Sequence, residues 1–268
     1  MGKYSKDRRD IFYRRAKEKG YRARSSFKLI QIDHHFGILK NCRRAVDLCA
    51  APGGWSQVLS DSLSGLGENE GKIIAVDLQS IAPINGVRML KADITDPKTH
   101  AQIVKAFDGQ KADLVLSDGA PDATGLDDMD YYVQNELVLS ALKLAVQILE
   151  NGGTFLAKIF RGKHINCVVS VCKELFENVC IAKPTASRNY SIEAFVLCQN
   201  YKIFAKTPKI DKIFNKLREN SNRNLDSFCK FINCKGPSEL ENLDSDKNYN
   251  LVDVAAGSCL QGIYRAQK

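Results

Sequence analysis

Short apolar segments alternate with segments of helical periodicity along most of the chain, and this alternation constrains the fold more than any other feature. The apolar, strand-like segments are residues 44–49, 72–77, 87–90, 112–117, 154–160, 179–182 and 194–199. Helical patterns lie between them, at residues 55–63, 98–107, 132–149 and 168–176. Strands that alternate with helices build βαβ units and a parallel sheet covered on both faces. We therefore predict an α/β fold with a mostly parallel sheet of seven strands.

The last two predicted strands are joined differently. Only residues 183–193 separate them, which is too short for a helical crossover between parallel strands. We therefore predict that these two strands pair in the antiparallel sense. By analogy of fold, a parallel sheet that ends in an antiparallel hairpin resembles the outline of the Rossmann-like methyltransferases.

Three regions differ in composition. Residues 1–43 form a basic segment with one helical pattern at 22–36, residues 44–202 carry the strand–helix alternation, and residues 203–268 are a polar extension that we expect to be partly ordered. Residues 1–44 hold 14 Lys and Arg against 4 Asp and Glu, a net charge of +10, whereas the whole chain has +8. The basic charge therefore belongs to the N-terminal end.

The basic segment favours a polyanionic partner such as RNA. Arginine grips phosphate with two donors, and interleaved aromatic rings can stack on bases. The arginines are Arg8, Arg9, Arg14, Arg15, Arg22 and Arg24, and the aromatic residues are Phe12, Tyr13, Tyr21 and Phe27. A solvated run of charge is an equally weighted interpretation of this segment.

The sequence gives no indication of a membrane protein or of a metal-binding protein. No apolar run approaches the roughly 18 residues of a membrane span, and the first residues lack the apolar core of a signal peptide. The nine cysteines include no C-x-x-C pair, so we predict reduced thiols and no metal site. The expected location is cytoplasmic.

A turn of small residues follows the first strand. It reads Asp47-Leu-Cys-Ala-Ala-Pro-Gly-Gly-Trp55, and small residues let a ligand approach the backbone. A generic strand–helix turn is the structural alternative. The turn lacks the G-x-G-x-x-G pattern that cradles a pyrophosphate, which argues against NAD and FAD.

Acidic residues end the next three strands. Asp77, Asp93 and Asp118 follow the second, third and fourth strands, where open α/β sheets bind their ligands. Asp77 can accept from a ribose diol, and Asp93 can accept from an adenine amino group. Each aspartate alone is more often a turn former. Together they predict a site for a positively charged nucleoside, which S-adenosylmethionine is.

Several motifs resemble those of the FtsJ (RrmJ) family of RNA ribose 2′-O-methyltransferases. Residues 47–57, from Asp47 to Gln57, resemble the family's cofactor motif, and Asp118-Gly-Ala-Pro121 resembles its next motif. The resemblance covers about residues 1–202. It implies a Rossmann-like S-adenosylmethionine-dependent enzyme whose cofactor is held by Gly53, Gly54, Trp55, Asp77, Leu78, Asp93, Ile94 and Asp118.

The family uses a Lys-Asp-Lys-Glu catalytic tetrad. The matching positions are Lys28, Asp118, Lys158 and Glu193. The resemblance implies that Lys158 removes the proton of the ribose hydroxyl, while Lys28 and Glu193 orient Lys158 and the ribose. Asp118 is expected beside the transferred methyl group.

Within the family, the chain is most similar to the eukaryotic branch that methylates the tRNA anticodon loop. The segments that carry this similarity include residues 5–10, 76–79, 122–125 and 187–189. The branch implies nucleotides 32 and 34 as targets. It also implies a helper subunit, either a WD-repeat or a helical-repeat protein.

Three alternatives stay open at this point. A ribosomal RNA enzyme of the same family would use the same chemistry on another RNA. A catalytically inactive RNA-binding subunit would not need the tetrad, which is complete here. An RNA cytosine-C5 methyltransferase needs a nucleophilic cysteine after the Asp118 motif, and no cysteine lies between Cys49 and Cys167.

Overall fold

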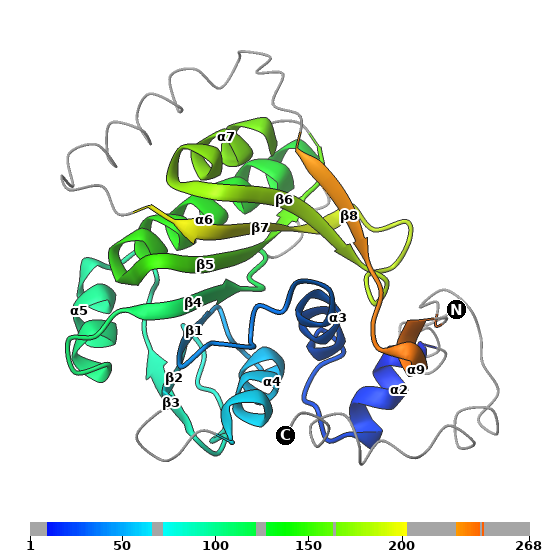
Figure 1. Ribbon diagram of the computed structural model, residues 1–268, viewed down its shortest axis with the longest axis horizontal. Coiled ribbons are helices and arrows are strands. Elements are labelled where there is room, and N and C mark those ends of the chain that lie inside the picture. The colour runs from blue at the N-terminus through cyan, green and yellow to red at the C-terminus, as the bar shows by residue number, and fades with distance from the viewer. Residues whose placement is uncertain are drawn as a thin grey trace.

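The computed structural model describes residues 10–65, 72–121, 127–162, 165–202, 229–241 and 243. One sheet of eight strands forms its centre (Figure 1). The strands are β1 (Arg44–Leu48), β2 (Lys72–Asp77), β3 (Val87–Lys91), β4 (Ala112–Ser117), β5 (Leu149–Phe160), β6 (Phe176–Pro184), β7 (Glu193–Tyr201) and β8 (Lys230–Cys234). These bounds confirm the seven strands predicted from the sequence and add an eighth.

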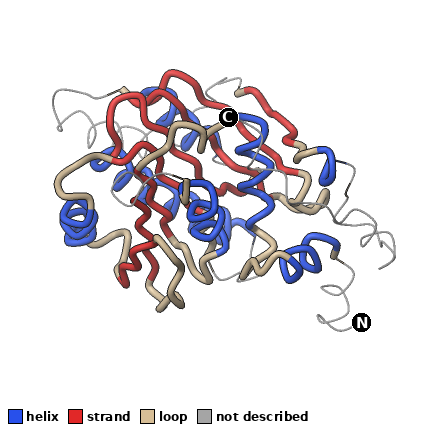
Figure 2. The backbone as a smooth tube through the Cα atoms, turned by 60° about the horizontal axis from the view of Figure 1, so that its bottom comes forward, coloured by secondary structure: helices blue, strands red, loops and turns tan. Residues whose placement is uncertain are grey.

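Helices cover both faces of the sheet, as Figure 2 makes visible. They are α2 (Ile11–Glu18), α3 (Ser26–Phe36), α4 (Gly54–Leu63), α5 (Pro97–Ala106), α6 (Asp127–Ile148), α7 (Ile165–Leu175) and the short α9 (Ser238–Glu241). Helices α3 and α4 pack on one face, and α5, α6 and α7 pack on the other. The predicted α/β fold is confirmed.

The strand order shows where a ligand crevice is expected along the sheet. The order is β3-β2-β1-β4-β5-β7-β6-β8, so the chain reverses its direction of travel between β1 and β4. Strands β1 to β5 are mutually parallel, and β7 is antiparallel to both β5 and β6. In doubly wound sheets the crevice for a ligand opens at this reversal point, beyond the carboxyl ends of the strands.

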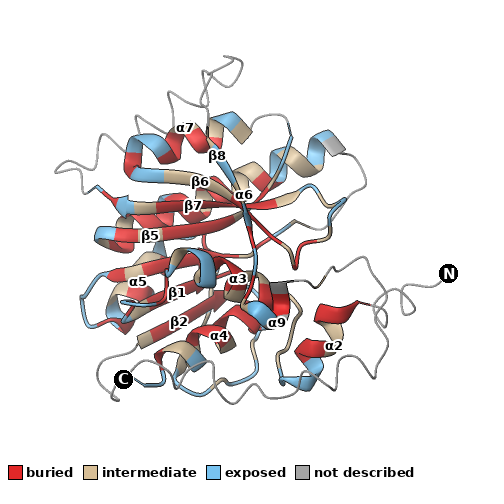
Figure 3. Ribbon diagram, turned by 45° about the vertical axis from the view of Figure 1, so that its right-hand side comes forward, coloured by how far each residue is buried: buried red, intermediate tan, exposed pale blue. Residues whose placement is uncertain are grey.

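The core follows the alternation of side chains along the strands. Val46 and Leu48 of β1 pack towards α5, α6 and α7, while Ala45 packs towards α3 and α4. Figure 3 shows that the central strands are buried along most of their length. A sheet buried on both faces holds the loops at its carboxyl edge on a rigid base.

Strand β8 was not predicted from the sequence. It pairs in parallel with β6, from Cys180–Lys230 to Pro184–Cys234, and lies at the edge of the sheet. Its sequence is short and lies within a polar extension, so periodicity alone gave no strand signal. Pairing covers the backbone groups that the outer edge of β6 would otherwise expose.

Helix α2 changes the interpretation of the basic N-terminal segment. Phe12 and Phe27 are fully buried, with ring centroids 5.6 Å apart, in a cluster that also contains Ile11, Ala186 and Leu240. The prediction that these two rings stack on bases is therefore wrong. They fix α2 against α3 and the loop after β6.

Asp10 begins α2 and is nearly inaccessible to solvent. Its Oδ1 accepts hydrogen bonds from the amides of Phe12 and Tyr13, at 3.0 and 3.1 Å. Its Oδ2 forms an ion pair with Arg24 and lies 3.6 Å from Nη2 of Arg188. One carboxylate thus joins the start of α2 to two arginines from other parts of the chain.

Two substitutions of Asp10 distinguish its role as the N-cap of α2 from its role as an ion-pair partner. Asp10→Asn keeps a capping oxygen but loses the charge, whereas Asp10→Ala loses both. We expect Asp10→Ala to have a free energy of unfolding about 1 kcal/mol below that of Asp10→Asn. Urea denaturation of both variants measures this difference, and equal stabilities would contradict the capping role.

Within the described ranges, no helix combines the length and the apolar character needed to cross a membrane.

Candidate functional site

A cavity of about 890 Å³ opens at the carboxyl edge of the sheet, beside the reversal point. It is lined by residues at or after the ends of β1, β2, β3 and β4, together with Arg22, Lys158 of β5 and two apolar residues of α6. Five of the predicted cofactor residues line it: Asp77, Leu78, Asp93, Ile94 and Asp118. The volume lies within the range of small-molecule sites, roughly 300–1,000 Å³.

Asp77, at the end of β2, and Asp93, after β3, both accept hydrogen bonds from backbone amides. Asp77 accepts from the amide of Ala51 through Oδ2, at 2.9 Å, and from the amide of Gln79 through Oδ1, at 2.7 Å. Asp93 accepts from both the amide and the hydroxyl of Thr95 through Oδ1. Each carboxylate oxygen can accept a further bond, so both residues are positioned to bind polar groups of a ligand.

Acidic side chains outnumber basic ones around the cavity, with three aspartates against Arg22 and Lys158. Burial, together with the negative charges of Asp118 and Asp77, raises the pKa of the nearby Asp47 to about 7 against the hydrogen bond from Ser56. Ser56 donates to Oδ2 at 2.6 Å, while Oδ1 is buried without a hydrogen-bond partner. Negative charge around a cavity suits a ligand with a sulfonium and an ammonium group, and it disfavours phosphate.

The paired glycines allow the turn after β1 to pack closely against two other segments. Gly53 has a φ of +109°, and a Cβ there would lie 2.8 Å from Cδ1 of Ile84. A Cβ on Gly54 would lie 2.8 Å from Oγ of Ser26. Neither glycine lines the large cavity. Glycine at these positions brings the turn after β1 against two other segments, and so shapes the cavity indirectly.

Trp55 is a core residue. Only 2% of it is exposed, its Nε1 donates to the carbonyl of Ser25 at 2.8 Å, and its ring lies 5.6 Å from that of Phe195. Trp55 does not line the large cavity, but together with Gly54 and Asp118 it lines a neighbouring cavity of about 30 Å³. Its position in the first turn of α4 directs it towards α3 and β7.

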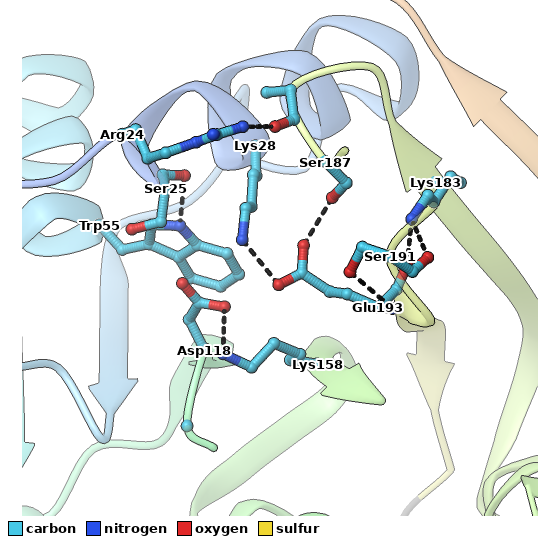
Figure 4. Close-up of polar contacts among 12 residues, drawn as sticks. Arg24, Ser25, Lys28, Trp55, Asp118, Lys158, Lys183, Ser187, Ser191 and Glu193 are labelled. Carbon is cyan, nitrogen blue, oxygen red and sulfur yellow. Dashed lines mark hydrogen bonds and ion pairs between the residues drawn. The ribbon is translucent and has the colours of Figure 1, made fainter. Parts of the chain in front are cut away.

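The four tetrad residues come together from four separate elements, α3, the end of β4, β5 and β7 (Figure 4). Nζ of Lys28 donates to Oε2 of Glu193 at 2.7 Å, and Nζ of Lys158 lies 3.2 Å from Oδ1 of Asp118. The four side chains are between 12% and 17% exposed. Two cation–carboxylate pairs, distant in sequence, thus meet beside the large cavity.

Glu193 is held in its ionised form. Burial raises its pKa, but the charge of Lys28, hydrogen bonds from Lys28 and Ser187, and the charge of Lys158 outweigh burial and lower the pKa to about 2. Ser187 donates to Oε1 of Glu193 at 2.6 Å. Glu193 is therefore an acceptor that fixes Lys28, and it cannot donate a proton near neutral pH.

Gln134 is a site residue that the sequence analysis missed. It is buried on α6, and its Nε2 donates to the carbonyls of Lys158, at 2.8 Å, and of Gly119, at 3.2 Å. It ties the backbone of the Lys158 strand to the loop that carries Asp118. A glutamine within an amphipathic helix gives no sequence signal for such a role.

The structure buries one member of the predicted RNA-binding set and gives two others contacts within the chain. Arg15 is only 8% exposed, on the buried side of α2. Arg22 donates to the carbonyls of Pro52, Ala82 and Pro83, and Arg24 donates to the carbonyl of Ala186. Arg15, Arg22 and Arg24 therefore have structural contacts. Arg14 is half-buried, and Arg8 and Arg9 lie outside the described residues.

Comparison with known proteins adds three findings. A family model described as FtsJ-like methyltransferase matches residues 21–201. A mouse protein named tRNA (cytidine(32)/guanosine(34)-2′-O)-methyltransferase is 46% identical over 268 residues, covering 96% of this chain and 80% of its own. A Drosophila melanogaster protein named tRNA (guanosine(34)-2′-O)-methyltransferase is 54% identical over 205 residues, covering 75% of this chain and 64% of its own.

One solved structure is also similar. A crystal structure described as a ribosomal RNA methyltransferase from Plasmodium falciparum superposes with a TM-score of 0.60 at 27% identity. The match covers 68% of this chain and 98% of the other.

Proposed function

The chain belongs to the FtsJ-like methyltransferase family, and from this membership we propose that it methylates ribose 2′-hydroxyls of the tRNA anticodon loop, at nucleotides 32 and 34. The observation that carries the proposal is the meeting of Lys28, Asp118, Lys158 and Glu193 at the edge of the large cavity. The named targets of the mouse and fly relatives support the choice of tRNA and of these two nucleotides.

S-adenosylmethionine is the proposed cofactor. Its positive groups match the carboxylates of Asp77 and Asp118, and its adenosine matches the apolar and acidic residues after β2 and β3. When bound, its sulfonium supplies an electrophilic methyl group. Asp77 would hold the ribose diol, and Leu78 and Ile94 would contact the adenine.

Lys158 is the proposed base. Its Nζ lies beside Asp118 at the cavity edge, where it would accept the proton that the ribose 2′-hydroxyl loses on methylation. Lys28, fixed by Glu193, would orient the hydroxyl.

Replacing Asp77 tests the cofactor site. Asp77→Asn keeps the size of the side chain but removes the charge that would accept from the diol. Because a hydrogen bond to a charged group contributes about 1.5–3 kcal/mol, we expect the Kd for S-adenosylmethionine to rise about ten- to hundredfold. Isothermal titration calorimetry measures it.

Asp96→Asn is the matched control, since Asp96 is exposed and caps α5, a role that asparagine also fills. Its Kd should equal that of the wild type. A Kd for Asp77→Asn within twofold of the wild-type value would contradict the proposal that Asp77 binds the cofactor.

The target is tested by mapping 2′-O-methyl groups in tRNA and ribosomal RNA from cells with and without this protein. We expect the groups at nucleotides 32 and 34 of tRNA to be lost. Loss confined to ribosomal RNA would replace the tRNA proposal with the ribosomal one. This test also serves if a helper subunit, which the family resemblance predicts, is needed for activity, because the cell supplies it.

A further inference from the structure

The loop after β2, residues 78–86, forms one wall of the large cavity. It contains no helix or strand, and all of its residues except Ile81 and Ile84 are exposed. A loop with so few buried apolar side chains has little stability of its own. Contacts from other segments must therefore hold this wall in place.

Arg22 joins this loop to the turn after β1. Its Nη1 donates to the carbonyl of Ala82 at 2.7 Å and to that of Pro52 at 3.2 Å, and its Nη2 donates to the carbonyl of Pro83 at 2.8 Å. Pro52 and Ala82 both line the large cavity, as Arg22 itself does. A guanidinium is a rigid, charged fork of donors, so this one side chain fixes the spacing between two loops.

The motif at residues 47–57 anchors Arg22 and makes room for it. The amide of Arg22 donates to Oε1 of Gln57 on α4 at 2.8 Å, and Nε2 of Gln57 donates to the carbonyl of Gly20 at 3.0 Å. A Cβ on Gly53 would lie 2.9 Å from Nη1 of Arg22. Glycine at this position therefore leaves the space that the guanidinium occupies.

We propose that Arg22 is a positioning residue of the cofactor site, which holds the loop after β2 in the conformation that receives the methyl donor. The inference deepens the proposed function and rests on it for the identity of that ligand. Asp77 and Leu78, proposed to contact the adenosine, lead directly into this loop, so the conformation of the loop decides how well the cavity fits. Composition assigned Arg22 to RNA, whereas its guanidinium meets three carbonyls of its own chain.

The first test needs no ligand. Arg22→Met keeps the apolar stem of the side chain and removes the donors, so the loop should open more often. Because slow cleavage follows the population of the opened form, we expect thermolysin to cleave before Ile81 and Ile84 about tenfold faster than in the wild type. Mass spectrometry of the fragments from the full chain measures both rates.

The second test measures the methyl donor. A loop that holds the binding conformation only part of the time weakens binding in proportion, so the Kd of Arg22→Met for S-adenosylmethionine should rise about tenfold. The Kd for an anticodon stem-loop RNA should change less than twofold. Calorimetry and fluorescence anisotropy measure the two. In turnover, the KM for S-adenosylmethionine should rise while kcat at saturation stays within twofold, a split that general loss of structure would not produce.

Two further variants calibrate these results. Arg22→Lys keeps the charge, but a single ammonium cannot span the carbonyls as the planar fork does, so its Kd should lie between those of the wild type and Arg22→Met. Arg43→Met is the matched control, because Arg43 is exposed and precedes β1, at the opposite end of that strand from the cavity. Its cleavage rate and both of its Kd values should equal those of the wild type.

The outcomes separate this inference from the proposed function. Cleavage of the loop as slow as in the wild type, or an unchanged Kd for S-adenosylmethionine in a chain that binds it, would overturn the role of Arg22 alone. Equal rises in both Kd values with a lower melting temperature would also overturn it, in favour of general destabilisation. A wild-type chain that binds no S-adenosylmethionine would overturn the proposed function, while the proteolysis would still decide whether Arg22 holds the loop.

Discussion

Replacing Lys158 with alanine is expected to lower the kcat of methyl transfer about 10²- to 10⁴-fold, the range that a positioned general base contributes. Lys158 is the tetrad amine that lines the large cavity, and its Nζ is 3.2 Å from Asp118. The affinity for S-adenosylmethionine should stay within a few-fold, because the residues proposed to hold the adenosine lie after β2 and β3. Single-turnover transfer and calorimetry measure the two quantities separately.

Two comparisons make this result specific. Lys158→Met keeps an unbranched side chain of similar length and should be as inactive as Lys158→Ala, which would assign the loss to basicity rather than packing. Lys105→Ala removes an exposed lysine of α5 and should have wild-type kcat. A Lys158→Met enzyme with a tenth or more of the wild-type turnover would show that another group takes the proton.

Replacing Glu193 with glutamine should change how stability depends on pH. In the folded chain its pKa is about 2, against an ordinary value of 4.5, so ionised Glu193 stabilises the fold above pH 4.5. That contribution is lost as the pH falls from about 4.5 towards 2. At 1.36 kcal/mol per pKa unit, the free energy of unfolding of the wild type should fall by on the order of 3 kcal/mol more than that of Glu193→Gln.

Near neutral pH, Glu193→Gln should have a lower free energy of unfolding than the wild type. Glu193→Gln leaves Lys28 largely buried beside a neutral amide, so it should be less stable than the wild type and should transfer methyl groups slowly. Urea denaturation between pH 7 and 2, followed by the fluorescence of the single tryptophan, Trp55, measures the effect. Glu177→Gln, at an exposed position of β6, should have the pH dependence of the wild type. Parallel curves for the wild type and Glu193→Gln would contradict the lowered pKa.

The sequence predicted the elements of the core well because strand and helix periodicities are local. Asp77 and Asp93 could be placed in the cavity from the same information, since the carboxyl ends of neighbouring parallel strands share one edge. The tetrad could not be derived this way: Lys28 and Glu193 are 165 positions apart, and only the family resemblance paired them.

The errors have a common physical cause. Phe12, Phe27 and Arg15 were assigned to RNA by residue type, but the tertiary packing of α2 and α3 buries them. Composition cannot distinguish a ring that stacks on a base from one that packs on another helix. Strand β8 and Gln134 were missed for the opposite reason, because each acts through a partner distant in sequence.

The cluster that joins α2, the loop after β6 and Leu240 has a consequence for synthesis on the ribosome. The lining of the large cavity spans only residues 22–158, so all of it has been translated while more than a hundred residues are still to come. The tetrad needs Glu193, and the cluster needs Leu240. A nascent chain therefore possesses every residue that would bind the methyl donor long before its tetrad is complete.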